Sequence, residues 1–208
     1  RLTREDPPVQ THPRVTKRDA TAECGQDTSA AWHTANLAAL AACATEACEN
    51  DLTITSDFAN APFVVDCGTT GTTTVTYTVT DDCGNDTDFV ATYTVEDTTD
   101  PDLSSCASRD ATAECGQDNI AAWHTANLAA LAACATDACD NDLTITSDFA
   151  NAPFVVDCGT TGTTTVTYTV TDDCGNDTDF VAPYTVEDTT EHDLTGCTST
   201  PATFECCA

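Results

Sequence analysis

The feature that most constrains the fold is an internal repeat, because one stretch of the chain occurs twice almost unchanged. Segment 18–99 recurs 91 positions later with only five substitutions: Thr28 by Asn119, Ser29 by Ile120, Glu46 by Asp137, Glu49 by Asp140 and Thr92 by Pro183. A repeat this faithful is one fold used twice. We therefore predict two domains of the same architecture, residues 18–108 and residues 109–199.

Each copy contains a pattern typical of a β-hairpin. Val75, Tyr77 and Val79 alternate with threonines, which places apolar side chains on one face of a strand and hydroxyls on the other. A turn rich in Asp, Gly and Asn follows at residues 81–86, and a second alternating run extends from Phe89 to Val95. The pattern predicts two antiparallel strands with one buried and one solvent-facing side.

The rest of each copy predicts one helix and three short strands. In the first copy we expect strands at residues 21–24, 52–58 and 63–66, and an alanine-rich helix at residues 28–44 that Asp27 caps. Trp32, Leu37, Leu40 and Cys43 share one face of that helix, which should pack on the sheet. The sequence therefore predicts a mainly β chain: two tandem, disulfide-rich β-sandwich repeats, each with one short helix.

Two segments lie outside the repeats. Residues 1–17 are rich in proline and basic residues, and we interpret them as a flexible basic arm with the capacity to add as a strand to another sheet. Residues 200–208 contain PATFEC, which echoes DATAEC at residues 110–115 and opens an incomplete third repeat. Because the chain contains no methionine, we expect its N-terminus to arise by processing.

Fourteen cysteines in a small chain indicate an oxidising compartment. The spacings of zinc sites are missing, so we predict disulfides. Three bonds per repeat would compensate for the small core, but six cysteines allow 15 pairings and the sequence does not choose among them. If the six cysteines of each repeat form disulfides only with one another, Cys206 and Cys207 are left over. At least one of these two then forms a disulfide with another chain. The predicted disulfide residues are Cys24, Cys43, Cys48, Cys67, Cys83, Cys106, Cys115, Cys134, Cys139, Cys158, Cys174, Cys197, Cys206 and Cys207.

The net charge of −29 is distributed unevenly, because five of the six basic residues lie within the first 18 positions. An acidic body repels nucleic acid and anionic membranes, and it attracts divalent cations or basic partners. The simpler interpretation is that the charge only keeps a secreted protein soluble. Because of this charge we expect no nucleic-acid binding. No apolar run is long enough to cross a bilayer, so we also expect no direct membrane insertion.

The acidic linker after the first hairpin is a candidate calcium site. Glu96, Asp97, Asp100 and Asp102 offer the clustered oxygens that hard cations need. The turn acids Asp81, Asp82, Asp86 and Asp88 could face this linker and add further oxygens. The alternative is a solvated acidic face with no ion, in which case the protein has no cofactor.

Two further sets of residues are candidates for a functional role, and each also has a simpler structural explanation. Asn85 and Asn176 lie in N-glycosylation sequons on predicted turns, where asparagine also serves turn geometry. His33 and His124 lie on the predicted helices, where a lone histidine is usually packed or solvated. No nucleophile, HExxH or phosphate-loop motif occurs, so we expect no enzyme activity.

The motifs together resemble a known family. The series ATAECG, the AAW helix, TEAC, VVDCGTTGTTTVTYTVTDDCGN and VEDTTDP is similar to the HYR-like, immunoglobulin-type repeats of large bacterial surface proteins. The resemblance implies Ig-like sandwiches in extracellular stalks, adhesins or matrix proteins without catalytic residues. Cys43 and Cys106 look like additions to the usual pattern. In the second copy DTTDPD becomes DTTEHD, which fits a terminal repeat.

These observations lead to two main functional hypotheses. The first is a non-catalytic structural protein at the cell surface, whose copies associate head to tail into an extracellular filament by terminal-strand exchange and disulfides. The alternative is a calcium-stiffened adhesin or stalk fragment that binds a surface ligand. Ice binding through the threonine rows is a third and weaker hypothesis, since each repeat offers only one good row.

Overall fold

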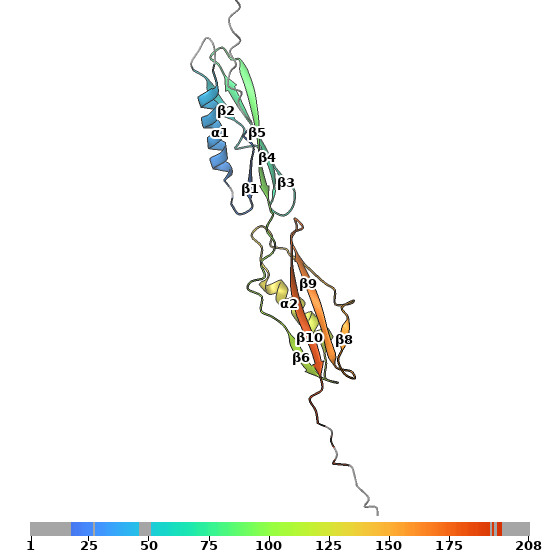
Figure 1. Cartoon of the computed structure of the whole chain (residues 1–208). Coiled ribbons are helices and arrows are strands. Elements are labelled where there is room, and N and C mark those ends of the chain that lie inside the picture. The colour runs from blue at the N-terminus through green and yellow to red at the C-terminus, as the bar shows by residue number, and fades with distance from the viewer. Residues whose placement is uncertain (1–17, 27, 46–50, 192, 194, 197–208) are drawn as a thin grey trace, which may run out of the picture.

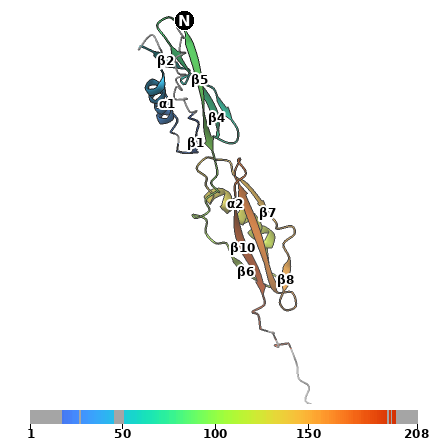
Figure 2. The same cartoon turned by 45° about the horizontal axis from the view of Figure 1, so that its top comes forward.

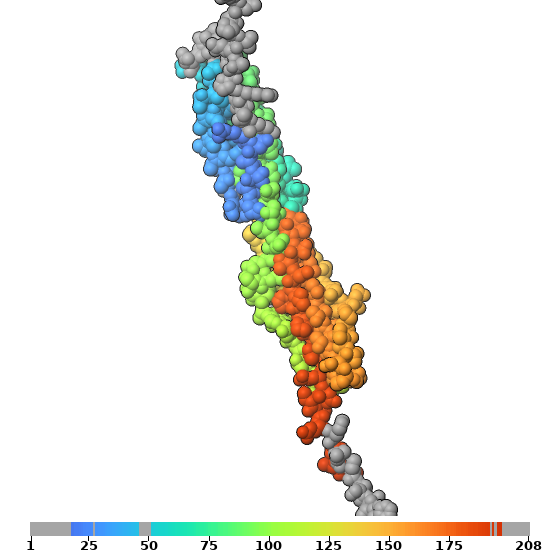
Figure 3. Space-filling view, viewed as in Figure 1, coloured from blue at the N-terminus to red at the C-terminus, as the bar shows by residue number. Residues whose placement is uncertain are grey.

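The computed structural model describes residues 18–26, 28–45, 51–191, 193, 195 and 196. Two domains of similar structure lie end to end along one axis, and the molecule narrows where they meet (Figures 1 and 3). We call residues 18–108 repeat 1 and residues 109–199 repeat 2. The predicted arm at residues 1–17 and the predicted third-repeat strand at residues 200–208 lie outside the described residues.

Each repeat builds one five-stranded sheet and one helix, so the predicted fold class is confirmed. In repeat 1 the sheet order is β1-β5-β4-β2, and β3 also pairs with β4; β6 to β10 repeat this order in repeat 2. The first strand is parallel to the last one and all other pairs are antiparallel. The elements of repeat 1 are β1 (Ala20–Glu23), α1 (Ser29–Cys43), β2 (Thr53–Ser56), β3 (Phe63–Val65), β4 (Gly71–Thr80) and β5 (Asp86–Glu96). Those of repeat 2 are β6 (Ala111–Glu114), α2 (Ile120–Cys134), β7 (Thr144–Ser147), β8 (Phe154–Val156), β9 (Gly162–Thr171) and β10 (Asp177–Glu187).

The core of each sandwich-like domain lies between the helix and one face of the sheet (Figures 1 and 2). Val75 and Tyr77 of β4 are completely buried, as their alternation with threonine predicts. Trp32 and Leu40 pack on them from α1, and each such side chain contributes roughly 1.5–3 kcal/mol through the apolar surface it removes from water. The core therefore follows directly from the alternating pattern of the hairpin.

The helices begin and end within one residue of their predicted bounds. In repeat 2 the Asn119 side chain caps α2 by accepting a hydrogen bond from the Ala122 backbone N–H at 3.2 Å, a contact worth about 1 kcal/mol. The cap is therefore one residue later than the predicted position, and in repeat 1 the predicted cap Asp27 lies outside the described residues. Neither helix in the described part of the chain is long and apolar enough to cross a membrane.

Two glycines allow a short edge strand to pair closely with the hairpin. A Cβ atom on Gly71 would lie 2.2 Å from the carbonyl oxygen of Val64, and one on Gly162 would lie 2.3 Å from that of Val155. Any side chain at these positions would therefore push β3 or β8 away from its partner strand. The pairing of β3 with β4, and of β8 with β9, depends on glycine at these two positions.

The two histidines are packing residues, as the simpler interpretation predicted. The His33 ring stacks on Phe58 with 4.1 Å between ring centroids, and His33 Nδ1 lies 3.1 Å from the Tyr77 hydroxyl oxygen. His124 repeats both contacts with Phe149 and Tyr168. Burial lowers the pKa of both histidines from the ordinary value of 6.5.

These lowered pKa values predict a pH dependence of stability. Because the folded state favours the neutral rings, their contribution is complete above about pH 6.5 and is lost as the pH falls from that value through the folded-state pKa. Chemical denaturation at pH 7.5 and pH 5.5 should show a lower free energy of unfolding at pH 5.5. The double variant H33Q/H124Q should show a smaller difference, and an equal difference in both proteins would contradict this role.

Candidate functional site: the joint between the repeats

Two disulfides cross from one repeat to the other. Cys24 bonds Cys139 and Cys67 bonds Cys174, with Cα–Cα separations of 5.7 and 5.2 Å. Cys24 and Cys67 follow β1 and β3 at the end of repeat 1 that faces repeat 2. Their partners lie in the loop after α2 and in the turn between β9 and β10. The two repeats are therefore covalently joined at two separate points, in addition to the chain itself.

The possibility that each repeat closes its own six cysteines is wrong, and strand length gives the reason. The turn between β4 and β5 lies at the opposite end of repeat 1 from the loop between β3 and β4. The ten residues of β4 separate these ends by roughly 30 Å at about 3.3 Å per residue. A disulfide needs its two Cα atoms within about 7 Å. Cys67 at one end therefore cannot reach Cys83 at the other, but it reaches Cys174 in the next repeat.

The remaining cysteines divide into three groups. A third disulfide joins Cys106 of the linker to Cys134 at the end of α2. Cys43, Cys115 and Cys158 form no disulfide among the described residues, and Cys83 is exposed. The predicted disulfide residues Cys48, Cys197, Cys206 and Cys207 lie outside the part of the chain that the structure describes.

Hydrogen bonds join the linker and repeat 1 to repeat 2. The Asn176 side-chain amide donates to the carbonyl oxygen of Asp97 at 3.2 Å, and the Thr178 hydroxyl donates to that of Pro101 at 2.7 Å. Asp102 and Thr136 form an isolated antiparallel bridge. The Thr69 hydroxyl of repeat 1 donates to the carbonyl oxygen of Cys139 at 3.1 Å. Repeat 2 therefore binds the linker through its β9–β10 turn and through the residues that follow α2.

Repeat 1 also meets repeat 2 directly at a glycine. A Cβ atom on Gly68 would lie 2.7 Å from a carboxylate oxygen of Asp140. Asp140 is buried, and it accepts a hydrogen bond from the Asp173 backbone N–H at 2.5 Å. The carboxylate of Asp140 thus fills the space that the missing side chain of Gly68 leaves open.

Three carboxylates from different segments converge in the joint. Asp97 of the linker, Asp137 of the loop after α2 and Asp172 of the β9–β10 turn each place one oxygen within 4.8 Å of the others. Asp97 is only 9% exposed, and its Oδ2 atom is buried without a hydrogen-bond partner. Burial, together with the charges of Asp137 and Asp172, raises the pKa of Asp97. The cluster therefore concentrates negative charge at a site where Asp97 and Asp172 are buried and Asp137 is half-buried.

The chemistry of this cluster suits a hard divalent cation. Calcium binds oxygens at about 2.3–2.6 Å, so two ligands on opposite sides of one ion are about 4.8 Å apart. A bound cation would also satisfy the buried Oδ2 atom of Asp97 and offset the repulsion between the carboxylates. A second group, Glu23, Asp97 and Cys139, includes a sulfur that is already in a disulfide and supplies no thiolate.

The structure brings together a different set of acids from the one that the sequence predicted. Of Glu96, Asp97, Asp100 and Asp102, only Asp97 belongs to the cluster. Asp100 is exposed, and the carboxylate of Asp102 accepts hydrogen bonds from Ser104. These contacts to Ser104 lower the pKa of Asp102.

The expectation that the acidic turn of repeat 1 faces this linker is also wrong. The turn with Asp81, Asp82, Asp86 and Asp88 lies at the far end of repeat 1, because the eleven residues of β5 separate it from the linker. The turn that meets the linker is the equivalent one of repeat 2, which contributes Asp172. The 91-residue repeat was the available signal, since it shows that the linker after the first copy is followed by a second copy of the same turn.

The two predicted glycosylation asparagines have different surroundings. Asn85 is exposed, and its side-chain amide donates to Asp81 at 2.8 Å. This contact contributes most to lowering the pKa of Asp81. Asn176 is half-buried in the joint and donates to both Asp172 and Asp97. A glycan on Asn176 would displace these joint contacts, whereas Asn85 has room for one; glycosylation stays a prediction.

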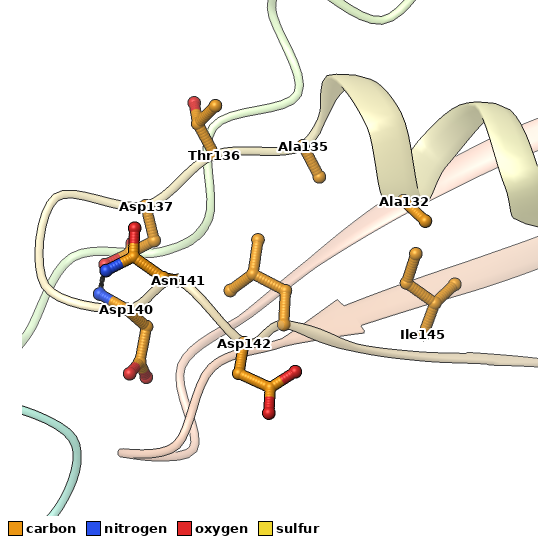
Figure 4. A pocket seen from close by; sticks show the side chains of 9 residues that line it. Ala132, Ala135, Thr136, Asp137, Asp140, Asn141, Asp142 and Ile145 are labelled. Atoms are coloured by element: carbon orange, nitrogen blue, oxygen red, sulfur yellow. Dashed lines mark hydrogen bonds between the residues drawn. The ribbon is translucent and has the colours of Figure 1, made fainter.

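A small acidic hollow adjoins the joint on repeat 2 (Figure 4). It has a volume of about 300 Å³ and lies between the end of α2 and the loop that carries Asp137, Asp140 and Asp142. The Asp140 backbone N–H donates to Asp137 within this loop, and the Asp140 carboxylate points away from Ile145 (Figure 4). Alanine, aliphatic, amide and carboxylate side chains dominate the lining.

A comparison of the sequence with known protein families finds no matching family, and a comparison with curated proteins finds no match. The resemblance to HYR-like repeats therefore stays a prediction.

The joint geometry predicts that the two crossing disulfides hold the repeats in one orientation. In the variant C24S/C139S/C67S/C174S both repeats should stay folded, because their cores lie within each repeat. The remaining hydrogen bonds contribute only about 0.5–1.5 kcal/mol each, so the linker should open more often. An aspartate-specific protease should cleave the linker about tenfold faster, as ~1.4 kcal/mol of lost restraint implies.

The matched control removes the disulfide that ties the chain after the linker to the end of α2. The variant C106S/C134S keeps both bonds of Cys24 and Cys67 to repeat 2, so its cleavage between Glu96 and Pro101 should change less. Equal cleavage rates for wild type and the four-cysteine variant would show that the disulfides do not restrain the joint.

Proposed function

We propose that this protein is a non-catalytic structural component of an extracellular filament or surface appendage, built by head-to-tail association. The observation that carries the proposal is the joint, in which the end of one repeat is covalently fastened to the beginning of an identical fold. A surface that meets a different surface on the next unit produces an open chain, because no symmetry closes it. A rod of such units extends in one direction without a limit set by its own geometry.

The setting of the protein supports this role. Three disulfides indicate an oxidising, non-cytoplasmic compartment. Asp97, whose pKa is raised by burial, lies in the joint between the repeats beside two other carboxylates. The histidines that would be the first candidates for acid–base chemistry are stacked on phenylalanines. Strand exchange by residues 1–17 or 200–208 belongs to the proposal, although both segments lie outside the described residues.

The proposal predicts elongated assemblies of the purified chain. Negative-stain electron microscopy at neutral pH, after incubation in an oxidising thiol buffer, should show beaded threads whose repeat matches one domain. Removal of residues 1–17 should shorten the threads if the arm adds to a neighbouring sheet. A population of single two-bead particles at every protein concentration would contradict the proposal.

A second candidate function is favoured by the buried acids of the joint. In this alternative the chain is a calcium-stiffened stalk or adhesin fragment, in which an ion at Asp97, Asp137 and Asp172 fixes the repeats and another surface binds a ligand. The supporting observation is the Asp97 Oδ2 atom, which is buried and has no hydrogen-bond partner among the described residues. Such an atom costs free energy unless a cation or a proton satisfies it.

Calcium should therefore raise the melting temperature of the protein at neutral pH, and a chelator should lower it again. At a calcium concentration 100 times its dissociation constant the stabilisation is about 2.7 kcal/mol. The variant D97N should lose this response, and without calcium it should melt higher than wild type because a buried charge is removed. The matched control D100N alters an exposed linker acid and should respond like wild type. An unchanged melting temperature in wild type would exclude the ion.

A further inference from the structure

We propose that the joint between the repeats is a hinge under redox control, because its two crossing disulfides differ in their reactivity towards small thiols. Cys67–Cys174 is the labile bond, and Cys24–Cys139 is the permanent one. The difference arises from burial and from two carboxylates beside the permanent bond. The inference concerns the joint within one chain, so it goes beyond the proposed function and does not require copies of the chain to assemble.

The two bonds differ first in their access to solvent. Cys139 is 3% exposed and Cys24 is 9% exposed, so both cysteines of this bond are buried. Cys67 and Cys174 are both half-buried. An attacking thiolate must reach a sulfur atom before thiol–disulfide exchange begins, so the buried bond reacts more slowly.

Two carboxylates lie beside the buried bond. One oxygen of Glu23, one oxygen of Asp97 and Cys139 Sγ all lie within 4.8 Å of one another. The Glu23 carboxylate is fixed at this position, because it accepts hydrogen bonds from the backbone N–H and the hydroxyl of Thr98 at 2.9 and 3.0 Å. A negative charge at this distance repels the incoming thiolate, and it also disfavours the thiolate that must leave when the bond breaks.

The labile bond also has acids near it, but their charges are better compensated. Asp66 and Asp173 directly precede Cys67 and Cys174 in the chain, and both acids are exposed to solvent, which screens them. Asp172 is buried, but each of its carboxylate oxygens already accepts a hydrogen bond from the β9–β10 turn. These acids therefore oppose an approaching thiolate less than the two carboxylates beside the buried bond do.

The opening reaction is a thiol–disulfide exchange with a low-molecular-weight thiol, RSH, as the reductant. The thiolate RS⁻ attacks Cys174 Sγ, the S–S bond breaks, and Cys67 leaves as a thiolate. The Thr70 hydroxyl oxygen lies 3.1 Å from Cys67 Sγ, so this hydroxyl is placed to donate a hydrogen bond to the thiolate. A second RS⁻ attacks the mixed disulfide on Cys174 and leaves as RSSR. One protein disulfide is reduced, two RSH are oxidised to one RSSR, and their two protons pass to the two protein thiols.

Opening this bond leaves the repeats attached at one place. The Cys24 backbone N–H donates to the carbonyl oxygen of Glu96 at 2.8 Å, so the remaining crossing disulfide starts beside the first residue of the linker. The disulfide and the linker then act as a single tie about which repeat 1 turns. Gly68, which meets Asp140 of repeat 2, directly follows Cys67 and is no longer held there by a covalent bond.

The third disulfide does not change this arrangement. Cys106 and Cys134 are half-buried and line a cavity of about 260 Å³, so a small thiol has access to their bond as well. Because Cys106 follows the linker, opening its bond releases the chain after the linker and not the sheet of either repeat. Of the three disulfides in the described part of the chain, Cys24–Cys139 is therefore the one that should persist.

The order of reduction tests the inference on the full oxidised chain. Thiols already present are blocked with N-ethylmaleimide in a chelator-containing buffer, and the folded chain is then exposed to 2-mercaptoethanol for increasing times. New thiols are labelled with iodoacetamide, and the labelled peptides are quantified by mass spectrometry. Cys67 and Cys174 should be labelled first, and Cys24 and Cys139 at least about tenfold more slowly. Equal rates, or faster labelling of Cys24 and Cys139, would overturn the inference.

The role of charge is tested with a matched pair of variants. Glu114 is the counterpart of Glu23 and accepts the same hydrogen bonds from Thr189, but the adjoining Cys115 forms no disulfide among the described residues. E23Q should speed the reduction of Cys24–Cys139, and it should do so more for anionic mercaptoacetate than for uncharged 2-mercaptoethanol. E114Q should leave both rates as in wild type. An unchanged rate in E23Q, or an equal acceleration with both reagents, would contradict protection by charge.

The hinge itself is measured by small-angle X-ray scattering of dilute protein. Mildly reduced wild type and the variant C67S/C174S should both show a broader distribution of shapes than oxidised wild type. The same scattering in all three samples would show that Cys67–Cys174 does not restrain the joint, and it would overturn the hinge. Because these measurements use single molecules in dilute solution, neither result decides whether the chain forms filaments.

Discussion

The structure depends on two disulfide bonds that leave one repeat and end in the next. One bond between two bodies would leave them free to rotate about it. The bonds of Cys24 and Cys67 with Cys139 and Cys174 fasten the repeats at separate places and remove that freedom. The hydrogen bonds from Asn176 and Thr178 to the linker then act on surfaces that are already held together. The disulfides therefore hold together an interface that these hydrogen bonds alone would be too weak to maintain.

The joint also carries an electrostatic cost. The body of the protein is strongly acidic, but most of its carboxylates lie at the surface, where solvent screens them. Asp97 is different, because closing the joint buries it beside Asp137 and Asp172. The covalent bonds keep the joint closed against this repulsion. The same acids thus make the closed joint responsive to cations or protons.

The sequence predicted the fold well because the repeat and the alternation of the hairpin are local signals. Val75 and Tyr77 are buried where the period of two places them, and both helices lie within one residue of their expected bounds. The joint was harder to predict, because it depends on which end of a repeat each loop occupies. Asp97 was found, but Asp137 and Asp172 are 40 and 75 residues away in sequence and were missed. Disulfide partners 107 and 115 residues apart have no signature in spacing alone.

The position of Cys24 at the end of β1 has a mechanical consequence. Tension that enters the described part of the chain at its N-terminal side runs along β1 and reaches Cys24 within a few residues. From there the load crosses the sulfur bridge directly to Cys139, which is 115 residues further along the chain. The hairpin and helix of repeat 1 lie inside this covalent loop, so the tension does not pass through them. Stretching therefore cannot unravel them unless a covalent bond breaks first.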